Sequence, residues 1–403
     1  MQALLLFLTV AALSVLASSP LLMRVGRAFG LAQLSASGLL FFVFGVAVGP
    51  LAMGVLDAAQ VEALRPLIAI GLTVVGVLTG FNVEPRLLRS LPWRLYAAVV
   101  TQGATSLVVV AAGLFAVFYL TGALDGMVAA LGAAALFGAV ASVSSPHVGI
   151  LGMRSGRLER REGLGLTLVA MLDDLWGLLA LMAALALASA VSIPDGFGLL
   201  ALAALLGLVC GLLLLFLTRA ASNEEEVATL LLGAVMLVGG AAAYLRISTL
   251  VAGVVCGATL SVLGRQAAAS HYKVLAKIER PVYLLLLFLA GPLFHPQTVW
   301  VWFVLPLFVV LRFVAKVAGG GLASRVGGGV IPPKTGWALV SQGGLSVCLV
   351  IEFLLLVPGP TSQLIFDVAL LAALINEVLG ARAFAIGFPP PARSMAPPAP
   401  EAN

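Results

Sequence analysis

GLTLVAMLDDLWGLLALMAAL, residues 165–185, places two adjacent aspartates in the middle of an otherwise apolar run. A charged side chain at the centre of a membrane-spanning helix costs about 2.5–3.5 kcal/mol on insertion scales. An ionisable group kept at such a position is a candidate functional site by default. Asp173 and Asp174 are therefore the residues from which the fold and the function are interpreted.

The composition of the whole chain requires a bilayer as its solvent. Of the 403 residues, 62% are hydrophobic and only 10% are charged, whereas a soluble domain carries about 25% charged residues. No soluble interior can hide so much apolar sequence. The formal charge of +5 resides in short loops between apolar runs. It therefore indicates membrane topology and no nucleic-acid partner.

Apolar runs long enough to cross about 30 Å of hydrocarbon recur along the chain. They predict an all-α integral membrane protein of about thirteen transmembrane helices. The expected spans are 2–18, 34–51, 64–81, 95–120, 127–147, 163–190, 196–219, 226–244, 247–264, 277–294, 298–322, 335–358 and 362–384. The first span has no basic residue before it, so we expect a retained helix and no cleaved signal peptide. The Pro- and Ala-rich segment 386–403 is expected to be a disordered cytoplasmic tail.

The basic residues distinguish the two sides of this topology. With the N-terminus outside, 18 of the 22 lysines and arginines fall in cytoplasmic loops or flank the last helix on that side. Only Arg65 and Arg246 fall on the other side, and Arg312 and Lys316 lie within a span. The positive-inside rule predicts an outside N-terminus and a cytoplasmic C-terminus. We expect a multi-pass protein of the bacterial inner (plasma) membrane.

Two of the expected spans are interrupted at membrane depth. The interruption in LGAAALFGAVASVSSPHVGI, residues 131–150, consists of Ser142, Ser144, Ser145 and Pro146. The one in TGWALVSQGGLSVCLVIEFLLLV, residues 335–357, consists of Ser341, Gln342, Gly343 and Gly344. Proline removes a backbone donor, and irregular backbone at this depth requires protein or a water-filled cavity around it. Either interruption alone is as compatible with an ordinary kink as with a functional break.

The relation between the two breaks is more informative than either break alone. The two broken helices are the fifth and the twelfth of the expected spans, seven positions apart, and because seven is odd they cross the membrane in opposite directions. This is the pattern of inverted-topology repeats, in which two unwound helices cross near the midplane. Their half-helix ends present partial charges to a bound ion.

Other ionisable side chains also lie within the expected spans. Arg312 and Lys316 are four residues apart in the span 298–322 and so share one helix face. A purely structural role is expected for one of these two cations. Glu352 and Asp367, in the last two spans, are candidate supporting groups that hydrogen-bond within the bundle.

The aspartates favour ion exchange as the chemistry of the site. Two carboxylates in a low-dielectric environment cannot both be charged at little cost, and they titrate as a coupled pair. Carboxylate, hydroxyl and carbonyl oxygens suit a hard monovalent cation such as Na⁺, with K⁺ or Li⁺ also open. Cation and protons would compete for the same negative charge. We therefore predict a secondary-active cation/proton antiporter without a cofactor, whose ions are cargo.

At these residues the chain resembles the monovalent cation/proton antiporter-2 family, over about residues 1–385. LDDLWGLL (172–179) is similar to the paired-aspartate helix of that family, and KVAGGGLASR (316–325) to its lysine-bearing helix. SVSSP (142–146) and SQGGLS (341–346) resemble its two unwound crossing helices. GFNVEPRLLRSL (80–91) is similar to the end of an early helix.

The resemblance implies a core domain within about 95–190 and 298–384 and a dimerisation domain within about 1–81 and 196–294. It further implies a homodimer and an elevator-like movement of the core. Asp174 would be the principal carboxylate for cation and proton, and Asp173 the partner of Lys316, with Arg312 as second choice. A lysine that loses its partner when the cation binds would release a proton. Exchange would then be electrogenic.

Three other functions remain open on the sequence. A sodium-coupled symporter of an organic solute would use a similar scaffold, but it needs a larger polar cavity. A cation channel would conduct far faster than a carrier. An intramembrane aspartyl protease would need Asp174 and Asp367 to face each other, and no G-x-G-D sequence is present. The chain also contains no G-x-x-x-x-G-K-[ST] motif for ATP binding.

Overall fold

The computed structural model describes residues 38–56, 58–124, 126–188, 193–219, 221, 223–264, 266–328 and 331–389. All regular elements in these ranges are helices. They are α4 (Leu39–Val48), α5 (Ala58–Ala63), α6 (Arg65–Phe81), α7 (Pro85–Ser90), α8 (Trp93–Thr121), α9 (Met127–Ser142), α10 (His147–Arg154), α11 (Arg160–Ala188), α12 (Ile193–Thr218), α13 (Glu224–Leu245), α14 (Thr249–Gly264), α15 (Gln266–Leu293), α16 (Trp300–Gly327), α17 (Thr335–Ala338), α18 (Gly344–Leu356) and α19 (Pro360–Gly387).

Hydropathy and length identify seven described helices that can cross a membrane. Three further apolar helices, α6, α14 and α18, are shorter. The prediction of an all-α integral membrane protein is confirmed. The expected span 2–18 and the segment 390–403 lie outside the described residues, so the count of thirteen helices stays a prediction. Helix α19 continues to Gly387, slightly beyond the expected end of the last span.

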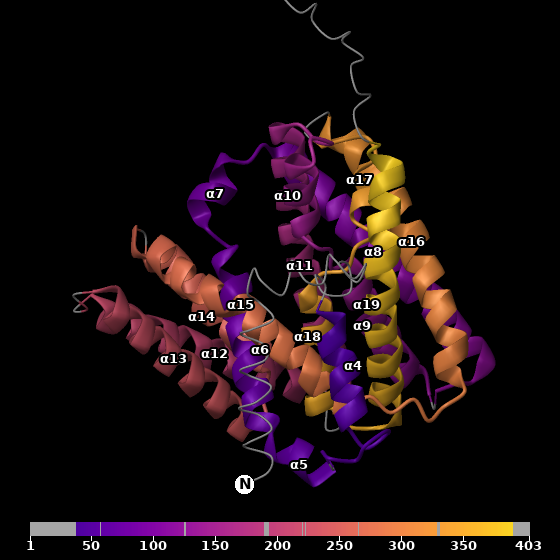
Figure 1. The fold of residues 1–403 in the computed structure, drawn as a ribbon, viewed down its shortest axis with the longest axis horizontal. Helices are drawn as coiled ribbons and strands as arrows, with labels where there is room; N and C mark the ends of the chain where they lie inside the picture. Colours follow the sequence, from indigo (N-terminus) through magenta and orange to yellow (C-terminus); the bar gives the residue numbers. More distant parts are fainter. Residues whose placement is uncertain are drawn as a thin grey trace, which may run out of the picture.

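One group of helices is built around a very close contact between α6 and α14 (Figure 1). Gly80 and Gly257 permit it, because a Cβ atom at Gly80 would lie 2.2 Å from the Val254 carbonyl oxygen. A Cβ atom at Gly257 would lie 2.0 Å from the Val77 carbonyl oxygen. Helices α12 and α13 pack on this pair, and α15 packs on α4 and α6.

A second group contains α8, α9, α11, α16 and α19 (Figure 1). Helix α8 packs against α9 and α16, while α9 also packs against α11 and α19. The buried rings of Phe118, Phe137 and Phe308 join α8, α9 and α16 in a continuous contact. Helix α18 lies between the two groups, since it packs on α9, α11 and α19 as well as on α6, α14 and α15.

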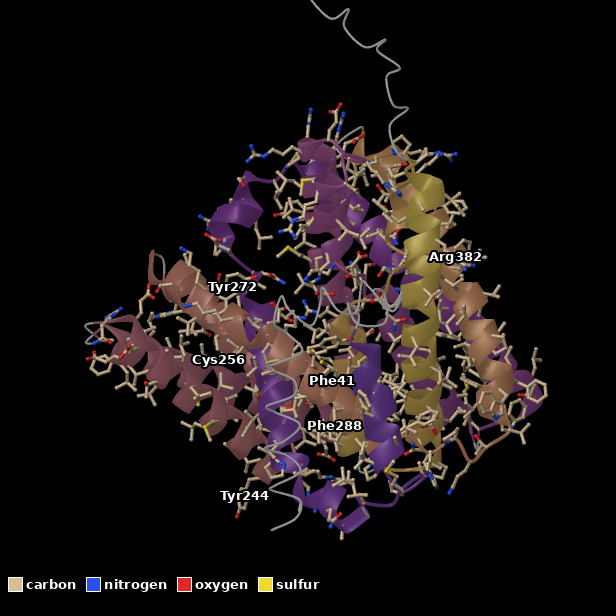
Figure 2. The ribbon with its side chains drawn as sticks, in the orientation of Figure 1. Phe41, Tyr244, Cys256, Tyr272, Phe288 and Arg382 are labelled. Carbon is tan, nitrogen blue, oxygen red and sulfur yellow. The ribbon has the colours of Figure 1, made fainter. Side chains whose placement is uncertain are left out.

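The outer faces of the helices are apolar. Helix α12 exposes Phe197, Leu205, Val209 and Phe216, each by more than half of its surface. Apolar area of this extent on a soluble monomer would be a liability, whereas lipid tails cover it in a bilayer. Tyr244 at the end of α13 is 88% exposed (Figure 2), a position typical of aromatic residues at the membrane interface.

Both interrupted spans are broken in the structure. Helix α9 ends at Ser142, and α10 begins at His147 after Pro146. Helix α17 ends at Ala338, and α18 begins at Gly344. The non-helical segments are therefore 143–146 and 339–343. The second begins two residues earlier than the polar residues indicated, and Ser142 and Gly344 are the terminal residues of helices.

Candidate functional site

Helix α11 carries Asp173 and Asp174, the aspartate pair, near its midpoint. Asp173 has no exposed surface, and Asp174 is 8% exposed. Adjacent residues on a helix point about 100° apart, so the two carboxylates meet different surroundings. This difference in environment allows the two acids to have different roles.

Asp173 is held in a buried ion pair. Its Oδ2 atom accepts a hydrogen bond from Lys316 Nζ at 3.2 Å and another from the Ser144 hydroxyl at 3.1 Å. The Lys316 ammonium also donates to the Ser144 Oγ atom at 2.7 Å and to the Ser142 carbonyl oxygen at 2.6 Å. Lys316 has no exposed surface. One side chain of α16 thus connects the paired aspartate to the end of α9 and to the first break.

Arg312, one turn before Lys316, binds backbone oxygens. Its guanidinium donates to the Val143 carbonyl at 2.9 Å and to the Val340 carbonyl. These carbonyls belong to the first and the second break, respectively. Arg312 forms no hydrogen bond with Asp173 in the described part of the chain. The structure therefore places Lys316, and not Arg312, on the aspartate.

The two breaks touch each other through their backbones. The Ser145 amide donates to the Ser341 carbonyl oxygen at 3.1 Å. Gly343 is equally close, because a Cβ atom there would lie 2.7 Å from the Ser144 carbonyl oxygen. Irregular backbone at this depth is tolerated because protein groups satisfy it. The unwound segments 143–146 and 339–343 therefore form one crossing.

Side chains of α19 support the second break. The Asn376 amide nitrogen donates to the Gln342 side-chain oxygen at 2.9 Å. The Ser341 hydroxyl donates to a Glu377 carboxylate oxygen at 3.2 Å. Asn376 and Gln342 are buried. The polar residues of this break are thus anchored on the neighbouring helix.

Asp174 differs from Asp173 in having no partner of this kind. No described residue donates a hydrogen bond to Asp174, and its Oδ1 atom is buried and unpaired, as is the Oδ1 atom of Asp173. Leaving a buried polar atom unpaired is costly, which is typical of a site that takes a ligand or an ion. No group of three or more His, Cys, Asp or Glu side chains gathers as a metal site among the described residues. Asp174 is therefore the member of the pair whose carboxylate has no hydrogen-bond donor among the described residues.

The two candidate supporting acids are engaged away from the aspartate pair. Glu352 on α18 accepts a hydrogen bond from the Thr249 hydroxyl at 2.7 Å and one from the Leu250 amide at 3.3 Å. It therefore satisfies donors at the N-terminus of α14, where a negative charge is favourable. Asp367 on α19 accepts a hydrogen bond from the His295 amide at 3.0 Å. Neither acid bonds to the aspartate pair in the described residues.

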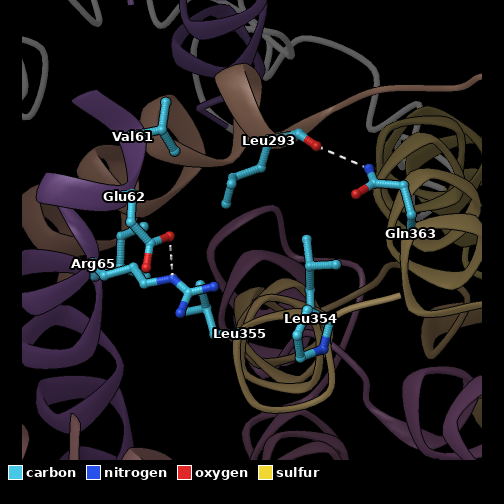
Figure 3. A pocket seen from close by; sticks show the side chains of 9 residues that line it. Val61, Glu62, Arg65, Leu293, Leu354, Leu355 and Gln363 are labelled. Carbon is cyan, nitrogen blue, oxygen red and sulfur yellow. Dashed lines mark hydrogen bonds and ion pairs between the residues drawn. The ribbon is translucent and has the colours of Figure 1, made fainter. Parts of the chain in front are cut away.

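A cavity of about 180 Å³ lies away from the aspartate pair, among α5, α6 and the ends of α15, α18 and α19 (Figure 3). Glu62 and Arg65 form an ion pair of 2.8 Å on one wall, and Gln363 donates to the Leu293 carbonyl at 2.9 Å on the other. The polar contacts on its wall are thus made within the protein and do not involve the aspartate pair.

Sequence reasoning missed several partners of the site. Thr249 begins an apolar span, and its hydroxyl faces an acid from a helix far along the chain. The only signal for it is the Ser248–Thr249 pair near the start of the expected span 247–264, a common start of a helix. The Val143 and Val340 carbonyls that bind Arg312 have no side-chain signature at all.

Comparisons with known proteins give one family and a shared fold. Residues 7–384 match the family described as "Sodium/hydrogen exchanger, transmembrane". No curated protein sequence matches the chain. A solved structure of the sodium proton antiporter MjNhaP1 from Methanocaldococcus jannaschii is 16% identical, with a TM-score of 0.65, covering 97% of this chain and 99% of that one. A second structure of that antiporter, from electron microscopy, is also 16% identical with a TM-score of 0.62, covering 95% and 97%.

Proposed function

Because the chain belongs to the sodium/hydrogen exchanger family, we propose that it exchanges a monovalent cation, in the first place Na⁺, for protons at Asp174. The observation that carries this assignment is the contrast within the aspartate pair. Asp173 accepts two hydrogen bonds at Oδ2, from Lys316 and Ser144, whereas no described residue donates a hydrogen bond to Asp174, and Oδ1 is unpaired on both acids. A carboxylate without a protein donor can accept either a proton or a cation.

Competition for this one negative charge couples the two ions. A charged Asp174 is costly to keep in a low-dielectric interior, so the loaded site is neutralised either by a proton or by a cation. A carrier that changes its orientation only when Asp174 is neutral must return a proton for each cation it moves. This coupling requires no separate gate.

Lys316 gives the cycle a second exchangeable proton. Its ammonium holds Asp173 while the site is empty. A cation shared by both aspartates would weaken that ion pair, and a buried lysine without its counter-charge tends to lose its proton. Two protons would then move against one Na⁺, so that exchange is electrogenic. K⁺ or Li⁺ would follow the same scheme.

The same proposal includes the architecture. The core domain would hold the crossing and the aspartate pair, within about 95–190 and 298–384, and the remaining helices would form the dimerisation domain of a homodimer. The packing of α8, α9, α11, α16 and α19 on one another supports this division. The paired-aspartate and lysine motifs support membership of the antiporter-2 branch. The basic residues support an outside N-terminus in a bacterial inner membrane.

The deciding experiment is exchange in proteoliposomes that contain a pH-sensitive dye. Asp174→Asn should abolish cation-driven proton movement while the protein stays folded. Asp367→Asn is the matched control, because Asp367 is equally buried but is bonded to the His295 amide. Retained exchange in Asp174→Asn, or equal loss in both variants, would remove the assignment.

A further inference from the structure

The crossing leaves backbone carbonyls without helical partners. Val143 follows the end of α9 at Ser142, and Val340 lies two residues beyond the end of α17 at Ala338, so these two carbonyls have no partner inside a helix. In the membrane interior they cannot turn to water, so a protein donor must satisfy them.

A single guanidinium supplies that donor for both breaks. Arg312 donates to the Val143 carbonyl of the first break at 2.9 Å and to the Val340 carbonyl of the second. It has no exposed surface. Among the described residues, these two bonds and the backbone hydrogen bond between Ser145 and Ser341 are the polar contacts that join the unwound segments.

Lys316 is used differently, although it lies on the same face of α16. Its ammonium is divided among the Ser142 carbonyl, the Ser144 hydroxyl and the Asp173 carboxylate. Arg312 reaches no carboxylate by a hydrogen bond among the described residues. The two cations therefore have separate contacts, one set made of backbone oxygens and the other including an acid.

From this division we infer that Arg312 is a positioning residue for ion exchange, a fixed clamp that keeps the two breaks in register. The inference rests on the proposed function. By carrying the charge that the carbonyls need, Arg312 leaves Lys316 free to pair with Asp173 and to separate from it. Ser144 lies next to the clamped Val143 carbonyl and bonds to both members of that pair, so the clamp sets their geometry.

The clamp requires the shape of arginine as well as its charge. A guanidinium presents its N–H groups as a rigid fork, whereas an ammonium is a point charge on a flexible stem. A lysine at position 312 can hold one carbonyl but not both in the same geometry. Replacing the arginine by lysine therefore separates geometry from charge.

The test measures exchange by Arg312→Lys and Arg312→Gln in proteoliposomes, over a range of Na⁺ concentrations and membrane voltages. Because both variants lose at least one charged hydrogen bond that fixes the crossing, KM for Na⁺ should rise roughly tenfold or more. The loss in kcat should be smaller. The reversal potential should stay at its wild-type value, because Arg312 exchanges no proton, whereas Lys316→Gln should shift it. Arg325→Gln is the control, since Arg325 is exposed near the end of the same helix.

Three outcomes would overturn the inference. A wild-type KM in Arg312→Lys would mean that charge alone suffices, and a wild-type KM in Arg312→Gln would remove the clamp altogether. A shifted reversal potential in Arg312→Gln would make Arg312 an exchanging cation. If neither variant folds, hydrogen exchange on the wild-type protein decides. The Ser145 amide should be protected, and exchange as fast as in an unstructured peptide would refute the clamp.

This test is separable from that of the proposed function. Asp174→Asn without activity, together with a wild-type KM in the Arg312 variants, would refute only the clamp. Exchange retained in Asp174→Asn would refute the assignment of Asp174 whatever the Arg312 variants do.

Discussion

Removal of the Lys316 ammonium should be among the most destabilising single changes in the molecule. Its Nζ atom donates to three acceptors at 2.6, 2.7 and 3.2 Å, and neither Lys316 nor Asp173 has any exposed surface. Lys316→Gln leaves Asp173 buried without its counter-charge. Breaking a buried ion pair by removing one partner costs about 3–5 kcal/mol. We expect that loss in the unfolding of the detergent-solubilised protein.

The double variant tests the cause of this loss. Lys316→Gln combined with Asp173→Asn leaves no unpaired buried charge, so it should be more stable than Lys316→Gln alone. Residues in direct contact show interaction energies of about 0.5–3 kcal/mol in such cycles, and this pair should lie near the upper end. Arg325→Gln on the same helix serves as the exposed control. If Lys316→Gln costs no more than this control, or if the two single losses simply add, the ion pair is not the source of the stability.

Three further perturbations have defined outcomes. Glu352→Ala should lower the free energy of unfolding by about 1–3 kcal/mol, because the Thr249 hydroxyl loses its acceptor. Glu352→Gln should lower the free energy of unfolding by less. Gly380→Ala should reduce both stability and exchange, since the new Cβ would lie 2.6 Å from backbone atoms of Ser341 in the crossing. Burial lowers the pKa of His271, which precedes the expected span 277–294, below its ordinary value of 6.5. The unfolded chain then takes up the proton first, so stability should fall as the pH drops below 6.5, and His271→Phe should weaken this dependence in unfolding curves measured against pH.

The sequence predicts the helices well because lipid imposes a simple rule on them. A membrane-spanning helix needs an apolar run long enough to cross the hydrocarbon core. The expected span 196–219, for example, corresponds to Ile193–Thr218 in α12. The first break was also indicated, because Pro146 removes a backbone donor and follows three serines within an apolar span. The start of the second break was not. Leu339 and Val340 are apolar and give no signal of a break. Their backbone is non-helical because of contacts with other parts of the bundle.

The detail of the site depends on contacts that side-chain patterns do not encode. Arg312 and Lys316 share one helix face, so the sequence leaves open which of them meets an aspartate. The structure separates them through two carbonyls, of Val143 and Val340, which any residue would supply. Glu352 likewise finds its partner on a helix distant in sequence. Pairings of this kind follow only from the assembled bundle.

The glycine contact between α6 and α14 has a mechanical consequence. At Gly80 and Gly257 the two backbones touch directly, and no rotatable side chain lies between them. Sliding one helix along the other by a single residue would drive a Cβ atom into a carbonyl oxygen. We expect this helix pair to resist sliding along the contact, so that α6 and α14 move as one unit. Relative movement of helices during transport must then occur at contacts made by side chains, such as that of Glu352 on α18 with Thr249 on α14.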